Sequence, residues 1–232
     1  RSSDLYDYWL IKFDGVTNHQ LGDPKGYGNI EYAYYLMAQA AGITMMESQL
    51  KKENQRAHFM TKRFDRLNNQ KLHTQTLCGL AHFDYNMPGA YSYEQAFQIM
   101  RQMQLPYTDM EELFRRMVFN IMARNQDDHT KNISFLMNPE GKWSLSPAYD
   151  ITFAYNPSNF WLKSHQMTIN GKKDDLNLTD VLTVAKNVHL KKPTQLIHEC
   201  REAIVRWGEF ADAAFINSEQ QAEIKGFFNL LM

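Results

Sequence analysis

Residues 125–132 read NQDDHTKN and gather carboxylate, amide, imidazole and ammonium groups within eight positions, directly after an apolar-striped helical segment. A further carboxylate, Asp150, ends the segment SPAYD. Carboxylate and amide oxygens suit a hard divalent cation such as Mg²⁺, which takes one or two protein ligands and completes its shell with phosphate oxygens and water. The candidate ligands are Asn132 and Asp150, and Asp127 is the candidate for proton transfer beside them.

A β-hairpin is expected to bring these two segments together. Residues 133–137 and 142–146 form two arms of equal length, and NPEG between them has the residues of a tight turn. Because equal antiparallel arms return the chain to its starting point, we expect Asp150 to lie beside the 125–132 segment. In that segment we expect Asp128 to face solvent and His129 to orient a neighbouring group rather than bind the cation.

The spacing of Asp127 and Asn132, D-x-x-x-x-N, is that of a protein kinase catalytic loop, where the Asp accepts a hydroxyl proton and the Asn binds a metal. Such a pair also arises by chance, so the residues around it must support it. Lys12 is the isolated charge in an apolar stretch, and Glu31 follows 19 residues later on the next helix. A strand lysine held by a helix glutamate can present its ammonium group to nucleotide phosphates.

Each of these residues also has a purely structural interpretation. Lys12 can be an edge residue whose stem packs while its ammonium group reaches solvent. Glu31 can be a favourable charge in the first turn of a helix. Asp127 can be a turn residue and Asp150 a helix cap. The Met-rich helix before the loop is expected to be core.

The sequence predicts the elements that position these groups. Residues 6–13 form an apolar, aromatic stretch that is typical of a strand buried on both faces. Two further strands are expected at residues 43–50 and 57–64. A helix is expected between the first two strands, with Asn29 as its N-cap and Gly42 as its stop. A turn is expected at residues 68–69.

After about residue 79 the pattern is helical except for the hairpin. Thr108 and Glu111 have the spacing of a capping box. The expected helices span residues 92–103, 108–122, 178–188, 194–207 and 218–231. We therefore predict an α+β, two-lobed, protein-kinase-like fold. Its sheet-rich, nucleotide-binding N-lobe covers residues 1–66 and its helical C-lobe, with the catalytic and metal-binding loops, covers residues 67–232.

Composition narrows the class of protein. The chain has 232 residues, 44% of them hydrophobic, and its 25 Lys and Arg nearly balance 26 Asp and Glu, so no overall charge favours nucleic acid or a membrane. Cys78 and Cys200 are far apart, which suits a reducing compartment, and no apolar run approaches the roughly 20 residues of a membrane span. A cytoplasmic protein is expected. Because the chain does not begin with Met, we expect it to lack upstream sequence.

Several segments together resemble the HipA family of bacterial serine/threonine kinases, which are toxins of toxin–antitoxin systems. The segments are LIKFDG, NIEYAYYLMAQAAGI, TKRFDR, NQDDHTKNISFL, LSPAYDI and HQMTINGK, and the resemblance runs from about Leu10 to about Leu182. It implies an ATP- and Mg²⁺-dependent protein kinase. The implied roles are catalytic base for Asp127, Mg²⁺ binding for Asn132 and Asp150, and contact with ATP phosphates for Lys12.

The resemblance implies further nucleotide contacts. The backbone of Lys62, Arg63 and Phe64 would form the hinge that reads adenine, with Asp65 near the ribose. The remaining residues in the family's nucleotide-binding segments are His129, Lys131 and Tyr149.

The resemblance also implies partners. The protein substrate would be an aminoacyl-tRNA synthetase, and an antitoxin with a DNA-binding domain would provide the contact with DNA. The family's phosphate-covering loop, with a serine that can be autophosphorylated, would lie upstream of Arg1. The expectation is therefore an incomplete chain, or a short or split member that works with a separate N-terminal-subdomain-like subunit. The glycines of GDPKGYGN follow Lys12 and are expected only to shape a turn.

Two other classes remain open from the sequence. The first is a kinase-shaped binding partner or co-repressor without catalytic activity. The second is a metal-dependent phosphohydrolase built on Asp127, Asp128 and His129. The further histidines that such a site needs are not evident, because those at positions 58, 73 and 82 lie in another region without metal-ligand spacing.

Overall fold

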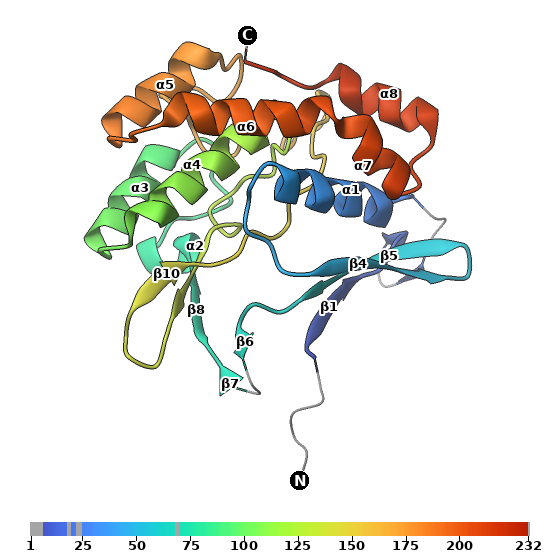
Figure 1. The fold of residues 1–232 in the computed structure, drawn as a ribbon, viewed down its shortest axis with the longest axis horizontal. Helices are drawn as coiled ribbons and strands as arrows, with labels where there is room; N and C mark the ends of the chain where they lie inside the picture. Colours follow the sequence, from blue (N-terminus) through green and yellow to red (C-terminus); the bar gives the residue numbers. More distant parts are fainter. Residues whose placement is uncertain (1–6, 18–19, 22–24, 68–69, 232) are drawn as a thin grey trace.

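The computed structural model describes residues 7–17, 20–21, 25–67 and 70–231. Figure 1 shows the helices gathered along one side of the molecule and the strands on the other, with α1 between the β4–β5 hairpin and the C-terminal helices. In the described part of the chain, none of the helices has the length and apolar character needed to span a bilayer.

The first sheet has three antiparallel strands in the order β1-β5-β4, with bounds Trp9–Lys12, Arg56–Lys62 and Ser48–Glu53. Lys12 pairs with Phe59 across β1 and β5. The predicted burial of the first strand on both faces is wrong. Among the described residues β1 pairs only with β5, and the side chains of Leu10 and Ile11 are 52% and 39% exposed.

Helix α1, Tyr27–Ala40, carries Glu31 over the first sheet. Its N-terminus is capped by the buried carboxylate of Asp14, which accepts hydrogen bonds of 3.1 to 3.3 Å from the backbone N–H groups of residues 25–27. The predicted Asn29 cap is wrong, because the Asn29 amide instead donates to the Ala214 carbonyl at 2.7 Å. The predicted stop is correct, with Gly42 at φ 81°.

The second sheet contains the predicted hairpin. β9, Ser134–Met137, and β10, Trp143–Leu145, pair in register, and β8, His73–Thr76, adds a third strand beside β9. Two further short hairpins are formed by β2 Val16–Thr17 with β3 Gln20–Leu21 and by β6 Arg66–Leu67 with β7 Gln70–Lys71. The predicted turn at residues 68–69 lies outside the described residues.

The helical part is formed by α2 Leu77–Ala81, α3 Tyr93–Gln102, α4 Tyr107–Met122, α5 Leu178–Asn187, α6 Pro193–Val205, α7 Trp207–Ala213 and α8 Ser218–Gly226. The Met-rich face of α4 is core as predicted, since Met117 and Met122 are fully buried. The predicted capping box of α4 is wrong, because the helix begins directly after Pro106 without a side-chain cap. The lobe boundary after residue 66 stays a prediction.

Candidate active site

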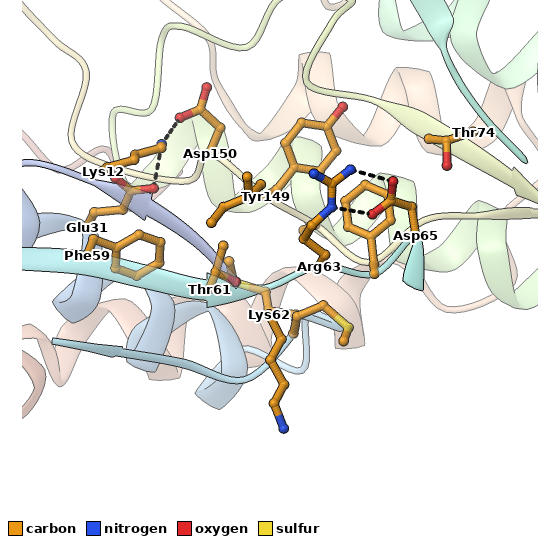
Figure 2. Close-up of a pocket in the computed structure, with 15 residues that line it drawn as sticks. Lys12, Glu31, Phe59, Thr61, Lys62, Arg63, Asp65, Thr74, Tyr149 and Asp150 are labelled. Atoms are coloured by element: carbon orange, nitrogen blue, oxygen red, sulfur yellow. Dashed lines mark hydrogen bonds and ion pairs between the residues drawn. The ribbon is translucent and has the colours of Figure 1, made fainter. Parts of the chain in front are cut away.

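The end of β1, the first turns of α1 and the segment after β10 meet around one ammonium group. Lys12 Nζ donates to Glu31 Oε1 at 2.7 Å and also contacts Asp150 Oδ1 (Figure 2). The ion pair that the sequence predicts between Lys12 and Glu31 is therefore present. The hairpin brings Asp150 to the same point, although the two residues are 138 positions apart.

Burial and charge act in opposite directions on this cluster. Burial alone would lower the pKa of Lys12, but the carboxylates of Glu31 and Asp150 outweigh it and raise that pKa. Burial raises the pKa of Glu31 to about 7, against the opposing effect of Lys12. Lys12 is therefore a permanent positive charge, and Glu31 becomes its fully ionised partner above neutral pH.

Asp127 lies on the loop that follows α4. Its carboxylate is 44% exposed, with Oδ1 3.8 Å from His129 Nε2, and its carbonyl oxygen accepts a 2.8 Å hydrogen bond from the Asn132 amide. Burial raises the pKa of Asp127, His129 and Lys12 lower it, and the nearby carboxylates of Asp128 and Asp150 raise it further. A partly accessible carboxylate with a raised pKa is suited to accept a proton.

Asn132 and Asp150 both line a small cavity between this loop and Tyr149. One amide oxygen and one carboxylate fit Mg²⁺, which takes few protein ligands when phosphate oxygens and water complete its shell. Asp150 has φ 57°, a backbone conformation that Asp tolerates better than most residues. Among the residues that the structure describes, no group of three or more His, Cys, Asp or Glu side chains could hold a metal.

Asp128 anchors the loop, and the expectation that it faces solvent is wrong. The residue is 3% exposed and accepts hydrogen bonds from the Tyr93 hydroxyl at 2.9 Å and the Gln166 backbone N–H at 2.8 Å. His165 Nδ1 lies 2.9 Å from the same carboxylate. The two adjacent side chains face opposite sides of the loop, since that of Asp127 is 44% exposed and that of Asp128 is buried against Tyr93 and His165.

A cavity of about 400 Å³ lies next to the Lys12 cluster, between the first sheet and Tyr149. Eight of the residues predicted to contact the nucleotide line this cavity. They are Lys12, Glu31, Lys62, Arg63, Phe64, Asp65, Tyr149 and Asp150. Apolar side chains, among them Leu10, Met46 and Phe59, line most of the rest, together with Thr61 and Thr74. The volume is in the range of small-ligand pockets. The predicted residues on the 127–132 loop are not among its lining residues and lie on the far side of Asp150.

The hinge segment is tied to its neighbours, and the backbone N–H groups of Lys62 and Arg63 donate to the carbonyl oxygens of Glu47 and Tyr8 at 2.9 and 2.8 Å. Lys62 points away from the other labelled residues in Figure 2, and its ammonium group pairs with Asp7 at 3.1 Å and Glu47 at 2.9 Å. The Arg63 guanidinium donates two hydrogen bonds of 2.8 and 2.6 Å to the Asp65 carboxylate, and these bonds lower the pKa of Asp65. Arg66 adds a 2.5 Å bond, so a ribose hydroxyl at Asp65 would share an oxygen with an arginine.

Tyr149 links the hinge to the 127–132 loop. Its ring centroid is 5.5 Å from that of Phe64, and its hydroxyl bonds to Ser134 Oγ and the Lys131 carbonyl at 2.5 Å each. His129 and the Lys131 side chain lie at the outer side of the loop, against Tyr85. Sequence reasoning did not find Tyr85, because nothing in its local sequence indicates contact with a loop more than 40 positions away.

The small sheet-bearing part, the larger helical part and the Lys–Glu–Asp cluster between them define an α+β protein of the kinase-like fold, as predicted. A family model described as the HipA-like C-terminal domain matches residues 2–208. The chain belongs to this family.

Solved structures agree in fold. A chain of the Shewanella oneidensis MR-1 toxin–antitoxin complex of HipA, HipB and operator DNA aligns with a TM-score of 0.71 and 18% identity, over 94% of this chain and 55% of that one. The Helicobacter pylori proinflammatory kinase CtkA aligns with a TM-score of 0.57 and 13% identity, over 95% of this chain and 87% of that one.

A curated relative named "Putative kinase Y4mE", from Sinorhizobium fredii, is 26% identical over 229 residues. The match covers 88% of this chain and 53% of the relative. The chain thus spans about half the length of this relative and of the Shewanella chain.

Proposed function

We propose that this chain carries the catalytic part of an ATP- and Mg²⁺-dependent serine/threonine protein kinase, the toxin of a toxin–antitoxin system. The observation that carries the proposal is the Lys12–Glu31–Asp150 cluster, which lies between Asp127 and a cavity of about 400 Å³. Membership of the HipA-like family and likeness to proteins named as kinases support it.

The cavity takes the adenosine part of the nucleotide. Leu10, Met46 and Phe59 provide apolar surface for the base. In the described part of the chain, the backbone N–H of Phe64 has no hydrogen-bond partner, so it is available to a ring nitrogen of adenine. Lys12 lies at the Asp150 end of this cavity, where its ammonium group meets the phosphates.

Phosphoryl transfer then depends on positioning and electrostatics. Asp127 orients the serine or threonine hydroxyl and accepts its proton, while the hydroxyl oxygen bonds to the γ-phosphorus and the bond to ADP breaks. Glu31 keeps Lys12 in place. Asn132 and Asp150 would hold Mg²⁺, which would supply positive charge to the phosphates when bound.

The partners follow from the relatives. The Shewanella complex contains HipB and operator DNA beside HipA. By analogy, we propose a DNA-binding antitoxin as partner, with contact to DNA through the antitoxin and no membrane association. An aminoacyl-tRNA synthetase in the cytoplasm is the proposed substrate, and a separate N-terminal-subdomain-like subunit is a further proposed partner.

Label transfer tests the proposal. The chain and its Asp127→Ala variant are incubated with Mg²⁺, γ-labelled ATP and a desalted, heat-treated bacterial lysate as acceptor. We expect label on serine or threonine with the wild type and none with the variant. Equal labelling by both would refute the role of Asp127. ATP binding in calorimetry without transfer would indicate an inactive binding partner, and phosphate release without protein labelling would indicate a phosphohydrolase.

A further inference from the structure

The loop of residues 82–91 packs one aromatic ring against two residues of the Asp127 loop. Lys131 Nζ lies 3.3 Å from the centroid of the Tyr85 ring. The His129 ring meets the same tyrosine in an edge arrangement, with centroids 5.8 Å apart and planes at 62°. Because His129 Nε2 is 3.8 Å from Asp127 Oδ1, Tyr85 contacts a side chain next to the candidate base and, in Lys131, a second side chain of the same loop.

Lys131 is held by this ring without a carboxylate. Its side chain is exposed, and in the described ranges it takes part in no ion pair within 4.0 Å. A cation on an aromatic face at an exposed site changes an equilibrium constant by about two- to fivefold. The ring thus restrains the ammonium group without neutralising its charge, which leaves it able to attract phosphate oxygens.

Hydrogen bonds and a ring contact hold the loop that carries Tyr85 on both sides of this residue. The Asp84 backbone N–H donates to the Tyr91 hydroxyl at 2.9 Å, and the Tyr91 ring stacks on Phe83 with centroids 4.2 Å apart. The Gly89 N–H donates to the Gln166 carbonyl at 2.8 Å, and the Gln166 N–H donates to Asp128, the anchor of the catalytic loop. Tyr85 is therefore held in a fixed place relative to Asp127.

We propose that Tyr85 is a positioning residue of the phosphoryl-transfer site, whose ring holds the Lys131 ammonium group and the His129 ring beside Asp127. This inference rests on the proposed kinase function and adds to it a residue outside the nucleotide-binding segments. The contact uses the face and edge of the ring, so the hydroxyl group of Tyr85 is dispensable.

The test compares Tyr85→Leu with Tyr85→Phe in the label-transfer assay at varied ATP. We expect kcat to fall about fivefold in Tyr85→Leu, with the KM for ATP within about twofold, and Tyr85→Phe to match the wild type. The matched control is Tyr107→Leu. The Tyr107 ring also contacts a lysine, Lys191 at 5.2 Å, but it stands at the first residue of α4, a helix of 16 residues and about 24 Å that leads to the Asp127 loop from its other end.

A double-mutant cycle separates positioning from general disturbance. In a Lys131→Met background, Tyr85→Leu should lower kcat less than it does in the wild type, because one of the two groups that the ring positions is gone. If Tyr85→Leu shows no cooperative thermal unfolding transition, and so is not folded, Tyr85→Met takes its place in the comparison. The inference is overturned if Tyr85→Leu has wild-type kcat, if Tyr85→Phe is equally impaired, or if the loss persists undiminished without Lys131.

The two proposals fail in different ways. Absence of transfer by the wild type would overturn the kinase function and this inference with it. Transfer by the wild type that Tyr85→Leu leaves unchanged would overturn the inference alone.

Discussion

Replacement of Asp128 with alanine is expected to destabilise the protein strongly, although the adjacent Asp127→Ala is expected to leave its stability unchanged. The Asp128 carboxylate is buried, accepts two hydrogen bonds of 2.8 and 2.9 Å, and lies 2.9 Å from His165 Nδ1. Alanine removes all three interactions and leaves the buried N–H of Gln166 without its acceptor. The Tyr93 hydroxyl keeps a 3.1 Å contact with Asn120.

The expected magnitude follows from these contacts. Hydrogen bonds to charged groups contribute about 1.5–3 kcal/mol each, and the loss of a buried carboxylate with its network reduces the free energy of unfolding by about 3–5 kcal/mol. For a chain of this length that is a fall in Tm of about 6–20 °C. The Asp127 carboxylate is 44% exposed, so its removal should change the free energy of unfolding by less than about 0.5 kcal/mol.

Thermal unfolding followed by circular dichroism, with both variants at the same concentration and pH, measures this difference. A Tm for Asp128→Ala within about 2 °C of the wild type would refute the anchoring role. An equal loss in Asp127→Ala would show that the two carboxylates do not face opposite sides of the loop.

Three further predictions concern α1 and α5. Gly28→Ala should lower the free energy of unfolding in urea by about 2–3 kcal/mol, because the new Cβ would lie 2.1 Å from the Ala57 carbonyl oxygen; wild-type stability would contradict this close contact. Glu31→Gln should weaken Mg²⁺·ATP binding in calorimetry about tenfold, because Lys12 loses its charged partner; unchanged affinity would contradict the role of the pair. Burial raises the pKa of Asp180, but its hydrogen bonds outweigh burial and lower it. Asp180 therefore stabilises the fold above its unfolded pKa, and the stability gap to Asp180→Asn should close as the pH falls below about 4; a gap that persists at pH 2 would refute this.

The sequence allowed prediction where local rules decide the structure. The NPEG turn and two equal arms specify the hairpin, and the hairpin alone brings Asp150 back to the 125–132 loop. The Lys12–Glu31 pair follows because a strand followed by a helix that packs on it places these residues on facing surfaces. Family motifs then supplied the hinge, which no local rule indicates.

Prediction failed where distant partners decide. The apolar pattern of the first strand suggested burial on both faces, but no described element covers Leu10 and Ile11 fully, and they are 52% and 39% exposed. Helix α1 takes its cap from Asp14, thirteen positions before Tyr27, and not from the nearest suitable residue, Asn29. The burial of Asp128 depends on His165 and Gln166, which local sequence patterns do not connect to it.

On the proposed function, Asn132 and Asp150 hold a cation that binds together with the nucleotide. Calorimetric titration of ATP into the wild type and Asp150→Ala, each with Mg²⁺ and with EDTA, tests this role of the two residues. Comparison of the two conditions within each protein separates the cation from the contact of Asp150 with Lys12. We predict that Mg²⁺ strengthens ATP binding by the wild type about tenfold or more and has little effect on Asp150→Ala. Equal strengthening in both proteins would contradict the claim.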